Sequence, residues 1–347
     1  MATILATSRS FGSGDRSLVD ELTAQGHTVH HLAPDHDREV LATVLPSVDA
    51  WIAGTAPITA ELLDLAPNLR VIARYGVGYE SVDVEAATAR GIVVTNTPGA
   101  NSGAVADHTV ALLLAAMRSL VAGDRRLRAG DWSSIRGREI GSATVGIVGF
   151  GRIGQGVARR LSGFGPRVLA ADPFVPAEVV AEAGAEPADL PAIARTCDVV
   201  SLHAPGGTTI VDEAWLAQLE RPIVLVNAAR ADLVDEEALA RALQDGRVRA
   251  YAADTLDGDV AGGSSPLLDP ALADRVTLTP HLGAQTVESV DAMGTLAVDN
   301  ALAVLEGTPP PHPVATPGAA AGTGAAAPPN PTVPDAAAGP TASKEQS

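Results

Sequence analysis

The chain has 347 residues, a formal net charge of −17 and one cysteine, Cys197. This length allows two domains of ordinary size. The acidic balance argues against nucleic acid and membrane partners, because both require basic patches. A single cysteine excludes a disulfide framework and a thiolate cluster, and no metal site is expected. The only lysine is Lys344, near the end of the sequence, so Schiff-base chemistry is excluded in the body of the chain. No signal peptide or apolar run of spanning length is predicted, so we expect a soluble, cytoplasmic protein.

Residues 2–97 alternate short apolar runs with helical patterns, which predicts a βα alternation and a parallel sheet. Strands are expected in TILATS, TVHHLA, DAWIAG, RVIARY and IVVTN, and helices from Ser17, Thr59 and Asp83. Residues 101–127 predict one helix with an apolar face that includes Val105 and His108. We expect this helix to cross into a second domain.

Residues 143–283 repeat the alternation in the runs TVGIVGF, RVLAAD, DVVSLHAP, IVLVNAAR, AYAADTL and RVTLTPHLG. Six such runs predict a doubly wound six-stranded sheet. A last helix is expected over 285–306, ended by Gly307 and the prolines after it. We therefore predict one domain over residues 101–284, inserted in a second formed by 1–100 and 285–311. Residues 312–347 are rich in Ala, Pro and Gly and predict a disordered tail.

A glycine fingerprint opens the second domain. A strand pattern runs into the GxGxxG of Gly149, Gly151 and Gly154 and then into a helix, an order typical of dinucleotide binding. The first glycine permits the tight turn, the second lets the backbone approach a pyrophosphate, and the third lets the helix pack against the strand. Asp172 ends the next strand, where a carboxylate favours the ribose of NAD over NADP. Two alternatives stay open: a glycine-rich turn of another α/β protein, and a turn at Pro173 capped by Asp172.

Three later segments bring polar residues to the carboxyl ends of predicted strands, where open α/β sheets bind ligands. Arg230 follows VNAA, the acids Asp254, Asp257 and Asp259 lie in YAADTLDGDVAGG, and His281 lies in VTLTPHLGA. Taken singly, each has a simpler interpretation: a surface arginine, solvated acids in a glycine-rich loop, and a structural histidine.

Taken together, the segments resemble the NAD-dependent D-2-hydroxyacid dehydrogenases, in particular their phosphoglycerate dehydrogenase-like branch. The resemblance covers roughly residues 45 to 307 and rests on RVIARYGVGYESVDVEAATARGIVVTNTPGANSGAVADHTVALLLA, VGIVGFGRIGQGVARRL, VNAARADLVDEEALARAL and LTPHLGA. It implies an α/β protein of two Rossmann-like domains, with a doubly wound NAD-binding domain inserted in a flavodoxin-like substrate domain. The implied activity interconverts a D-2-hydroxy acid and its 2-oxo acid, small anionic substrates, and the implied assembly is a homodimer.

The resemblance also implies roles for single residues. Arg230, Asp259 and His281 match the catalytic arginine, acid and histidine of the family. The substrate is expected at Arg74, Val77, Gly78 and Arg230. NAD is expected at Gly149, Gly151, Arg152, Ile153, Gly154, Asp172, His203, Ala204, Pro205, Ala228 and Asp254.

Some positions depart from the family pattern. Asp259 is followed by Val260 where the family has glutamate and proline, and Ala53 stands where many phosphoglycerate dehydrogenases place an arginine. Arg9, after the first strand, is a candidate contact for a distal anionic group, with solvent exposure as the alternative. An NAD-sensing, corepressor-like binding protein with little or no turnover is the alternative function.

Overall fold

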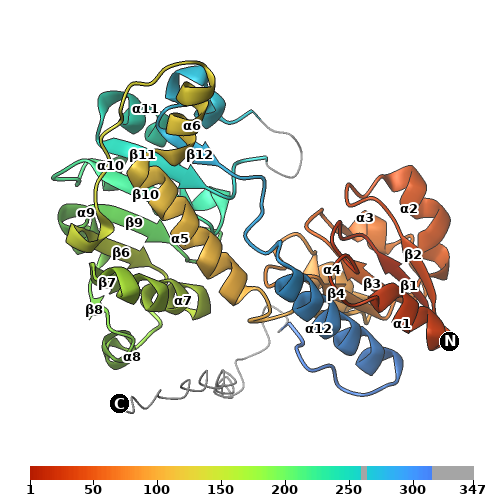
Figure 1. Ribbon diagram of the computed structural model, residues 1–347. Coiled ribbons are helices and arrows are strands. Elements are labelled where there is room, and N and C mark those ends of the chain that lie inside the picture. The colour runs from red at the N-terminus through yellow and green to blue at the C-terminus, as the bar shows by residue number, and fades with distance from the viewer. Residues whose placement is uncertain (259–263, 315–347) are drawn as a thin grey trace, which may run out of the picture.

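The computed structural model describes residues 1–258 and 264–314. Two parallel sheets, each flanked by helices, form two domains that lie side by side (Figure 1). The sheet of the first domain has the order β2-β1-β3-β4-β5. Its strands are β1 (Thr3–Ala6), β2 (Thr28–His31), β3 (Ala50–Ala53), β4 (Val71–Arg74) and β5 (Val93–Thr95). All five strands predicted in this half of the chain are confirmed.

The central strands of the first sheet are apolar at nearly every position because both of their faces are covered. All four residues of β3 are buried, and side chains alternate between two cores. Trp51 packs into one core, whereas Ile52 packs into the other. Helix α12 (Val287–Leu305) closes the second core with Met293, Ala297 and Ala301. The last helix within the described residues therefore returns to the first domain.

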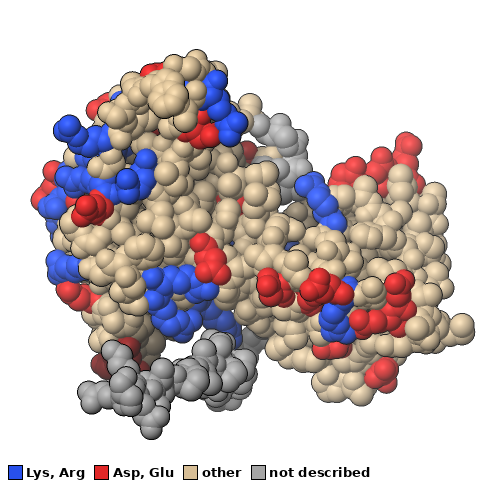
Figure 2. Space-filling view, viewed as in Figure 1, with Lys and Arg blue, Asp and Glu red and all other residues tan. Residues whose placement is uncertain are grey.

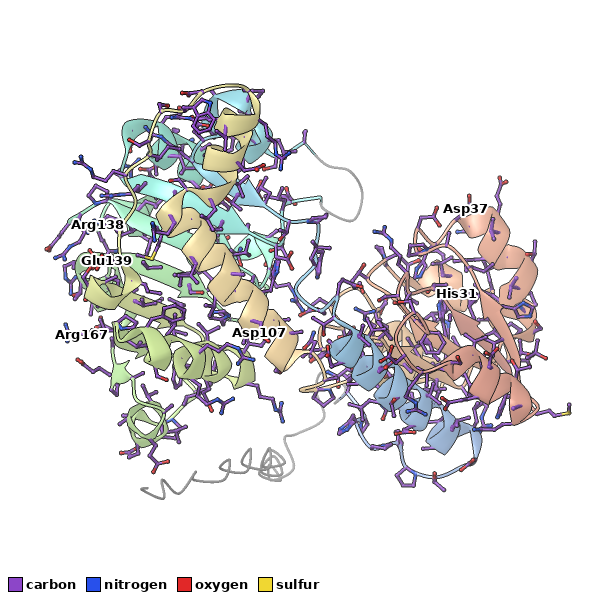
Figure 3. All side chains as sticks on the ribbon, in the orientation of Figure 1. His31, Asp37, Asp107, Arg138, Glu139 and Arg167 are labelled. Atoms are coloured by element: carbon purple, nitrogen blue, oxygen red, sulfur yellow. The ribbon has the colours of Figure 1, made fainter. Side chains whose placement is uncertain are left out.

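The other helices of the first domain are short. They are α1 (Leu18–Ala24), α2 (Arg38–Val44), α3 (Ala60–Leu63) and α4 (Val84–Ala89). The helices expected from Ser17, Thr59 and Asp83 are confirmed. Helix α2 was not predicted. It begins after Asp37, labelled in Figure 3, whose carboxylate accepts hydrogen bonds from the N–H groups of Glu39 and Val40.

The second domain contains a sheet of order β12-β11-β10-β9-β6-β7-β8. Its strands are β6 (Thr144–Val148), β7 (Arg167–Ala171), β8 (Glu186–Pro187), β9 (Val199–Leu202), β10 (Ile223–Asn227), β11 (Val248–Ala253) and β12 (Val276–Leu278). The six predicted strands are present, but the prediction of a six-stranded sheet was wrong. The seventh strand, β8, spans two exposed residues at the edge and includes Pro187, so it has no apolar pattern.

Helix α5 (Ser102–Arg118) carries the chain into the second domain. It packs along α7 (Arg152–Leu161), where Asp107 (Figure 3) accepts a hydrogen bond from Arg160 at 2.6 Å. The prediction of one helix over 101–127 was wrong in one respect. Ser119 has a φ of +51°, and α6 (Leu120–Arg128) continues after a bend of 60°. Within the described residues no single helix is long and apolar enough to cross a membrane, and only the bent pair α5 and α6 together has that length and composition.

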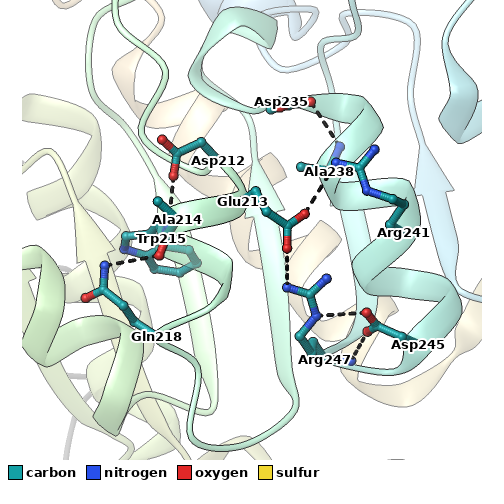
Figure 4. A network of polar contacts seen from close by, with 10 residues as sticks. All are labelled: Asp212, Glu213, Ala214, Trp215, Gln218, Asp235, Ala238, Arg241, Asp245 and Arg247. Atoms are coloured by element: carbon teal, nitrogen blue, oxygen red, sulfur yellow. Dashed lines mark hydrogen bonds and ion pairs between the residues drawn. The ribbon is translucent and has the colours of Figure 1, made fainter.

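The remaining helices of the second domain are α8 (Ala177–Glu182), α9 (Leu190–Thr196), α10 (Glu213–Leu216) and α11 (Glu236–Asp245). Figure 4 shows how α10 and α11 are joined. Glu213 accepts hydrogen bonds from Arg241 at 3.3 Å and Arg247 at 2.8 Å, and Asp235 caps α11 by accepting from the Ala238 N–H at 3.0 Å. These contacts fix the helix that follows the Arg230 loop.

The order of the elements is that of an inserted domain, because the chain leaves the first sheet after β5 and returns in α12. The exact boundaries at residues 100 and 284 stay predictions. The start of the predicted tail needs correction, since Val314 donates to Val94 at 2.8 Å and Pro313 bridges Thr95. Backbone pairing with β5 holds these residues although their composition is typical of disorder. The rest of the predicted tail lies outside the described residues.

The two domains also differ in surface charge on the face drawn in Figure 2. Acidic side chains gather over the first domain, whereas arginines are more frequent over the second. Charge is therefore unevenly distributed between the two domains on this face.

Candidate active site

The predicted site residues of the second domain follow the carboxyl ends of neighbouring parallel strands. Gly149 follows β6, His203 follows β9, Arg230 follows β10 and His281 follows β12. Because carboxyl ends of parallel strands share one edge of a sheet, the fold brings these segments together from positions far apart in the sequence. In the first domain, Arg74 is the last residue of β4 and so also lies at the carboxyl end of a parallel strand.

The three fingerprint glycines occupy three different environments. Gly149 has a φ of +89°, and a Cβ there would lie 2.5 Å from the N of Ala204. A Cβ on Gly151 would meet nothing within 4 Å, so the space over the start of α7 is open. A Cβ on Gly154 would overlap the carbonyl oxygen of Gly149. The structure therefore agrees with all three reasons given for glycine: a left-handed turn, an open approach, and close packing of helix on strand.

Asp172 supports the glycine turn from the end of β7. Its carboxylate accepts hydrogen bonds from the N–H of Phe150 at 2.7 Å and from the N–H of Phe174 at 2.8 Å. The second contact is the turn cap considered as an alternative. Asp172 therefore has a structural role in addition to its predicted contact with a ribose, which stays a prediction.

The loop after β9 lies directly against the glycine turn. His203 donates its backbone N–H to Val148 at 2.6 Å, and its Nε2 lies 2.8 Å from the Ser201 hydroxyl. Burial lowers the pKa of His203 to about 4, so the ring is neutral at physiological pH. Among the described residues its buried Nδ1 has no hydrogen-bond partner. Ala204 and Pro205 continue this loop, and Ala228 is buried at the end of β10.

Arg152 and Ile153 are the first two residues of α7. The aliphatic stem of Arg152 passes near Gly99, from which a Cβ would lie 3.6 Å from its Cδ. Ile153 packs partly against the core beneath α5. Both residues therefore stand at the opening beside Gly151.

Asp254 is almost completely buried at the end of β11 and holds the loop that carries His281. Its carboxylate accepts from the N–H groups of Leu282 and Gly283, each at 2.7 Å, and from the hydroxyl of Thr279 at 2.5 Å. Burial alone would raise the pKa of this carboxyl, but the hydrogen bonds outweigh burial and the pKa is lowered. Asp254 is therefore ionised at neutral pH. Its predicted contact with the nicotinamide stays a prediction.

His108 of α5 completes this network. Its Nε2 lies 2.9 Å from the Thr279 hydroxyl and 3.2 Å from a carboxylate oxygen of Asp254. Because the Thr279 hydroxyl donates to the carboxylate, it is left to accept from His108, so Nε2 carries the proton. Sequence reasoning placed His108 on an apolar helix face and missed this role. The available signal was a histidine on the otherwise apolar face.

His281 itself adopts a left-handed conformation, with a φ of +56°. Its N–H donates to the carbonyl oxygens of Thr279 at 3.0 Å and Asp254 at 3.1 Å, which hold it in a conformation that costs a non-glycine residue free energy. The side chain is exposed. Asp259, its predicted partner, lies outside the described residues. The neighbouring Asp257 donates its N–H to Glu236 of α11 at 2.9 Å.

Arg230 reaches from the second domain to the glycine turn of the first. Its Nη2 lies 3.4 Å from the nearer carboxylate oxygen of Glu80, and a Cβ on Gly78 would overlap the same nitrogen. Asn227 fixes the backbone below by donating to the carbonyl oxygen of Arg230 at 2.7 Å. Sequence reasoning missed Glu80, although it lies two residues after the glycine turn.

Arg74 donates hydrogen bonds to backbone carbonyl oxygens of its own domain. Its Nε donates to the carbonyl oxygen of Gly78 at 2.9 Å, and its Nη1 donates to those of Ala53 and Gly54. Burial lowers the pKa of Arg74 to about 10, which leaves it charged at neutral pH. The guanidinium therefore holds the turn through Nε and Nη1, and the expected contact of Arg74 with substrate stays a prediction.

The turn itself presents open donors. Asn96 donates to the carbonyl oxygen of Val77 at 2.8 Å, and the Thr97 hydroxyl accepts from Gly76 at 3.1 Å, so the turn is fixed from behind. No described residue accepts a hydrogen bond from the N–H groups of Val77 or Gly78. These groups suit an anion.

Comparison with known proteins identifies the family. Residues 110–283 match the family model described as D-isomer specific 2-hydroxyacid dehydrogenase, NAD binding domain. The chain is 42% identical over 277 residues to the D-3-phosphoglycerate dehydrogenase of Mycobacterium tuberculosis, an alignment that covers 78% of this chain and 52% of that protein. The chain thus spans about half the length of this relative.

Two further similarities extend over most of both proteins. The chain is 38% identical over 289 residues to the glyoxylate reductase of Pyrococcus furiosus, covering 79% of this chain and 84% of the relative. A solved D-lactate dehydrogenase from Aquifex aeolicus, complexed with NAD and lactic acid, is 26% identical with a TM-score of 0.77 and covers 88% of this chain and 96% of that one.

Fold, glycine turn and comparisons agree, and the resemblance inferred from the sequence is confirmed. The NAD-binding domain predicted from the fingerprint is confirmed as well, inserted in a second α/β domain. The chain belongs to the D-isomer-specific 2-hydroxyacid dehydrogenase family.

Proposed function

We propose that this chain is an NAD-dependent oxidoreductase that interconverts a D-2-hydroxy acid and its 2-oxo acid. The position of Arg230 carries the proposal. This cation stands at a strand end of the NAD-binding domain and reaches the turn of the first domain where the N–H groups of Val77 and Gly78 are open. The loop with His281 follows β12, which is separated from β10 only by β11. Arg230 and His281 thus follow strands at the same edge of the second sheet, and the turn of the first domain faces Arg230.

The residues at this edge fit a dinucleotide. The space above Gly151 is open, the first N–H groups of α7 have no acceptor within the helix, and the buried Nδ1 of His203 lacks a described partner. We propose that Gly149, Gly151, Arg152, Ile153, Gly154, Asp172, His203, Ala204, Pro205, Ala228 and Asp254 hold the cofactor. When bound, the nicotinamide would supply or accept the hydride.

The chain's own residues would orient the substrate and move its proton. Arg230 would bind the substrate carboxylate with its planar fork, together with the N–H groups of Val77 and Gly78. Arg74 would hold this turn. His281 would donate a proton to the carbonyl oxygen during reduction and remove it during oxidation. We propose that Asp259 is the acid that pairs with His281.

We also propose a homodimer. Its support is a group of exposed large apolar side chains in and after α6, with exposed fractions of 58% for Leu120, 49% for Leu127 and 85% for Trp132. Such groups mark contact surfaces more often than isolated exposed residues do. Light scattering after size exclusion should give twice the 35.2 kDa chain mass, and a monomer mass would reject the dimer.

The test of the activity is NADH oxidation, followed by absorbance, with glyoxylate, hydroxypyruvate, phenylpyruvate and 3-phosphohydroxypyruvate. We expect turnover with at least one acid and its loss in His281→Ala. His30→Ala, on edge strand β2, is the matched control and should keep full activity. NADH binding without turnover of any acid would reject the enzyme and favour the NAD-sensing alternative.

A further inference from the structure

Three charged side chains meet where the two domains face each other. Glu80 lies beside Arg230, with Nη2 3.4 Å from one carboxylate oxygen and 3.5 Å from the other. Burial is the main cause that lowers the pKa of Arg74, while the charge of Glu80 raises this pKa and the charge of Arg230 lowers it, so the three groups lie within electrostatic reach of one another. The cluster contains two cations and one anion.

The two cations are not equally available to a ligand. Arg74 is only 4% exposed, and three of its N–H donors are bound by the carbonyl oxygens of Ala53, Gly54 and Gly78. The Arg230 side chain is 38% exposed, and its partner Glu80 is 56% exposed. Arg230 is therefore the donor that an incoming carboxylate meets, and Glu80 is the group already beside it.

A second anion, Asp232, lies near the aliphatic stem of Arg230. A Cβ on Gly206 would lie 3.0 Å from the carboxylate of Asp232 and 3.3 Å from the Cγ of Arg230, so the two side chains flank the same glycine. Asp232 is held there by the N–H of Gly207 at 2.6 Å. With Arg74 and Glu80, the cluster then has two cations and two anions, so it carries no excess positive charge for further negative charges of a ligand.

We propose that Glu80 is a specificity-determining residue that competes with the substrate for Arg230 and restricts the site to 2-oxo acids with a single negative charge. The inference rests on the proposed function. A monocarboxylate displaces the exposed Glu80 carboxylate from Arg230 and takes over its interaction. A phosphorylated acid brings two more charges toward Glu80 and Asp232, and repulsion opposes its binding. Arg9, exposed after β1, is the residue that would have to offset that repulsion.

The experiment compares kcat/KM for glyoxylate and hydroxypyruvate with kcat/KM for 3-phosphohydroxypyruvate at low ionic strength. We expect the wild-type chain to prefer the singly charged acids. In Glu80→Gln, kcat/KM should rise about two- to fivefold for the singly charged acids, through KM, and about tenfold or more for the phosphorylated acid, because each added charge is repelled separately. Added salt should shrink this difference.

The matched control is Glu85→Gln, an exposed glutamate in the first turn of α4 with no arginine partner among the described residues. This control should leave kcat/KM unchanged for the singly charged acids and for the phosphorylated acid. A wild-type preference for the phosphorylated acid that is lost in Arg9→Ala would overturn the inference. An equal change for both substrates in Glu80→Gln would also overturn it.

Failure of the proposed function is distinguishable from failure of this inference. If no acid is turned over, the activity is rejected, and charge selectivity is measured instead by calorimetric binding of oxamate and of phosphonopyruvate to the NADH-loaded protein. The inference then requires that Glu80→Gln strengthen phosphonopyruvate binding more than oxamate binding. Equal changes, or no binding of either ligand, reject it.

Discussion

Replacement of Asp254 by asparagine tests the role of the buried carboxylate in positioning His281. The two carboxylate oxygens accept from opposite neighbours: one from Leu282 and Thr279, the other from Gly283. An asparagine offers one oxygen and one NH2 group. In either orientation the NH2 group faces a backbone N–H, so one buried donor loses its acceptor.

The magnitude follows from these contacts. One buried N–H without an acceptor costs about 1–3 kcal/mol, and the remaining bonds weaken by about 1 kcal/mol because their acceptor is no longer charged. The loop between β12 and α12 is then less stable, and the conformation of His281 with a φ of +56° loses part of its stabilisation. A displacement of the imidazole by about 1 Å lowers a rate by about a hundredfold.

We therefore expect kcat to fall about a hundredfold in Asp254→Asn, with a smaller change in the Kd of NADH measured by fluorescence. Asp189→Ala is the control, because it also removes a carboxylate that accepts a backbone hydrogen bond. Asp189 caps α9 by accepting from the Ala192 N–H at 2.7 Å, away from the site. This substitution should lower the stability by about 1 kcal/mol and leave kcat unchanged. A normal kcat in Asp254→Asn would refute the positioning role, and a raised Kd alone would favour the predicted contact with the nicotinamide.

Three further predictions concern the glycine turn and two buried groups. Gly151→Ala should keep the melting temperature but weaken NADH binding at least tenfold, because its Cβ enters the open space that the pyrophosphate needs. Gly154→Ala should instead lower the free energy of unfolding by about 1–3 kcal/mol, because its Cβ overlaps the carbonyl oxygen of Gly149. Calorimetry measures the change in stability, and NADH titration measures the change in binding. Because burial lowers the pKa of His203 to about 4, the unfolded chain binds a proton at higher pH than the folded chain, so stability should fall as the pH drops from about 6.5 toward 4. His203→Gln should reduce this loss between pH 7.5 and 5.5, and an identical pH dependence would contradict the assignment. Burial raises the pKa of Cys197 to about 12, so the thiol should resist a disulfide reagent at pH 8 in the native protein and react once per chain after unfolding in guanidinium.

The family and the NAD-binding domain were predictable from the sequence because their signals are local. Gly149, Gly151 and Gly154 follow a strand and open a helix within six residues, and backbone sterics at such a turn restrict each position by itself. The long apolar runs of β3 and β10 likewise predict buried parallel strands. Signals failed where they were short, as in β8, or where one residue broke the helix, as Ser119 does between α5 and α6.

The arrangement around the site was decided only by the tertiary structure. The resemblance predicts a substrate contact for Arg74, and only the structure shows that its guanidinium also donates to carbonyl oxygens 20 or more positions away and to its own turn. Glu80 and Arg230 are 150 positions apart, and His108 and Thr279 are 171 apart. No local pattern encodes such pairs, because Glu80 meets Arg230 only when the two domains pack together, and His108 meets Thr279 only when α5 packs on the second sheet. The sequence alone therefore determined which chemistry the chain carries, and the packing of the two domains decided which charges surround it.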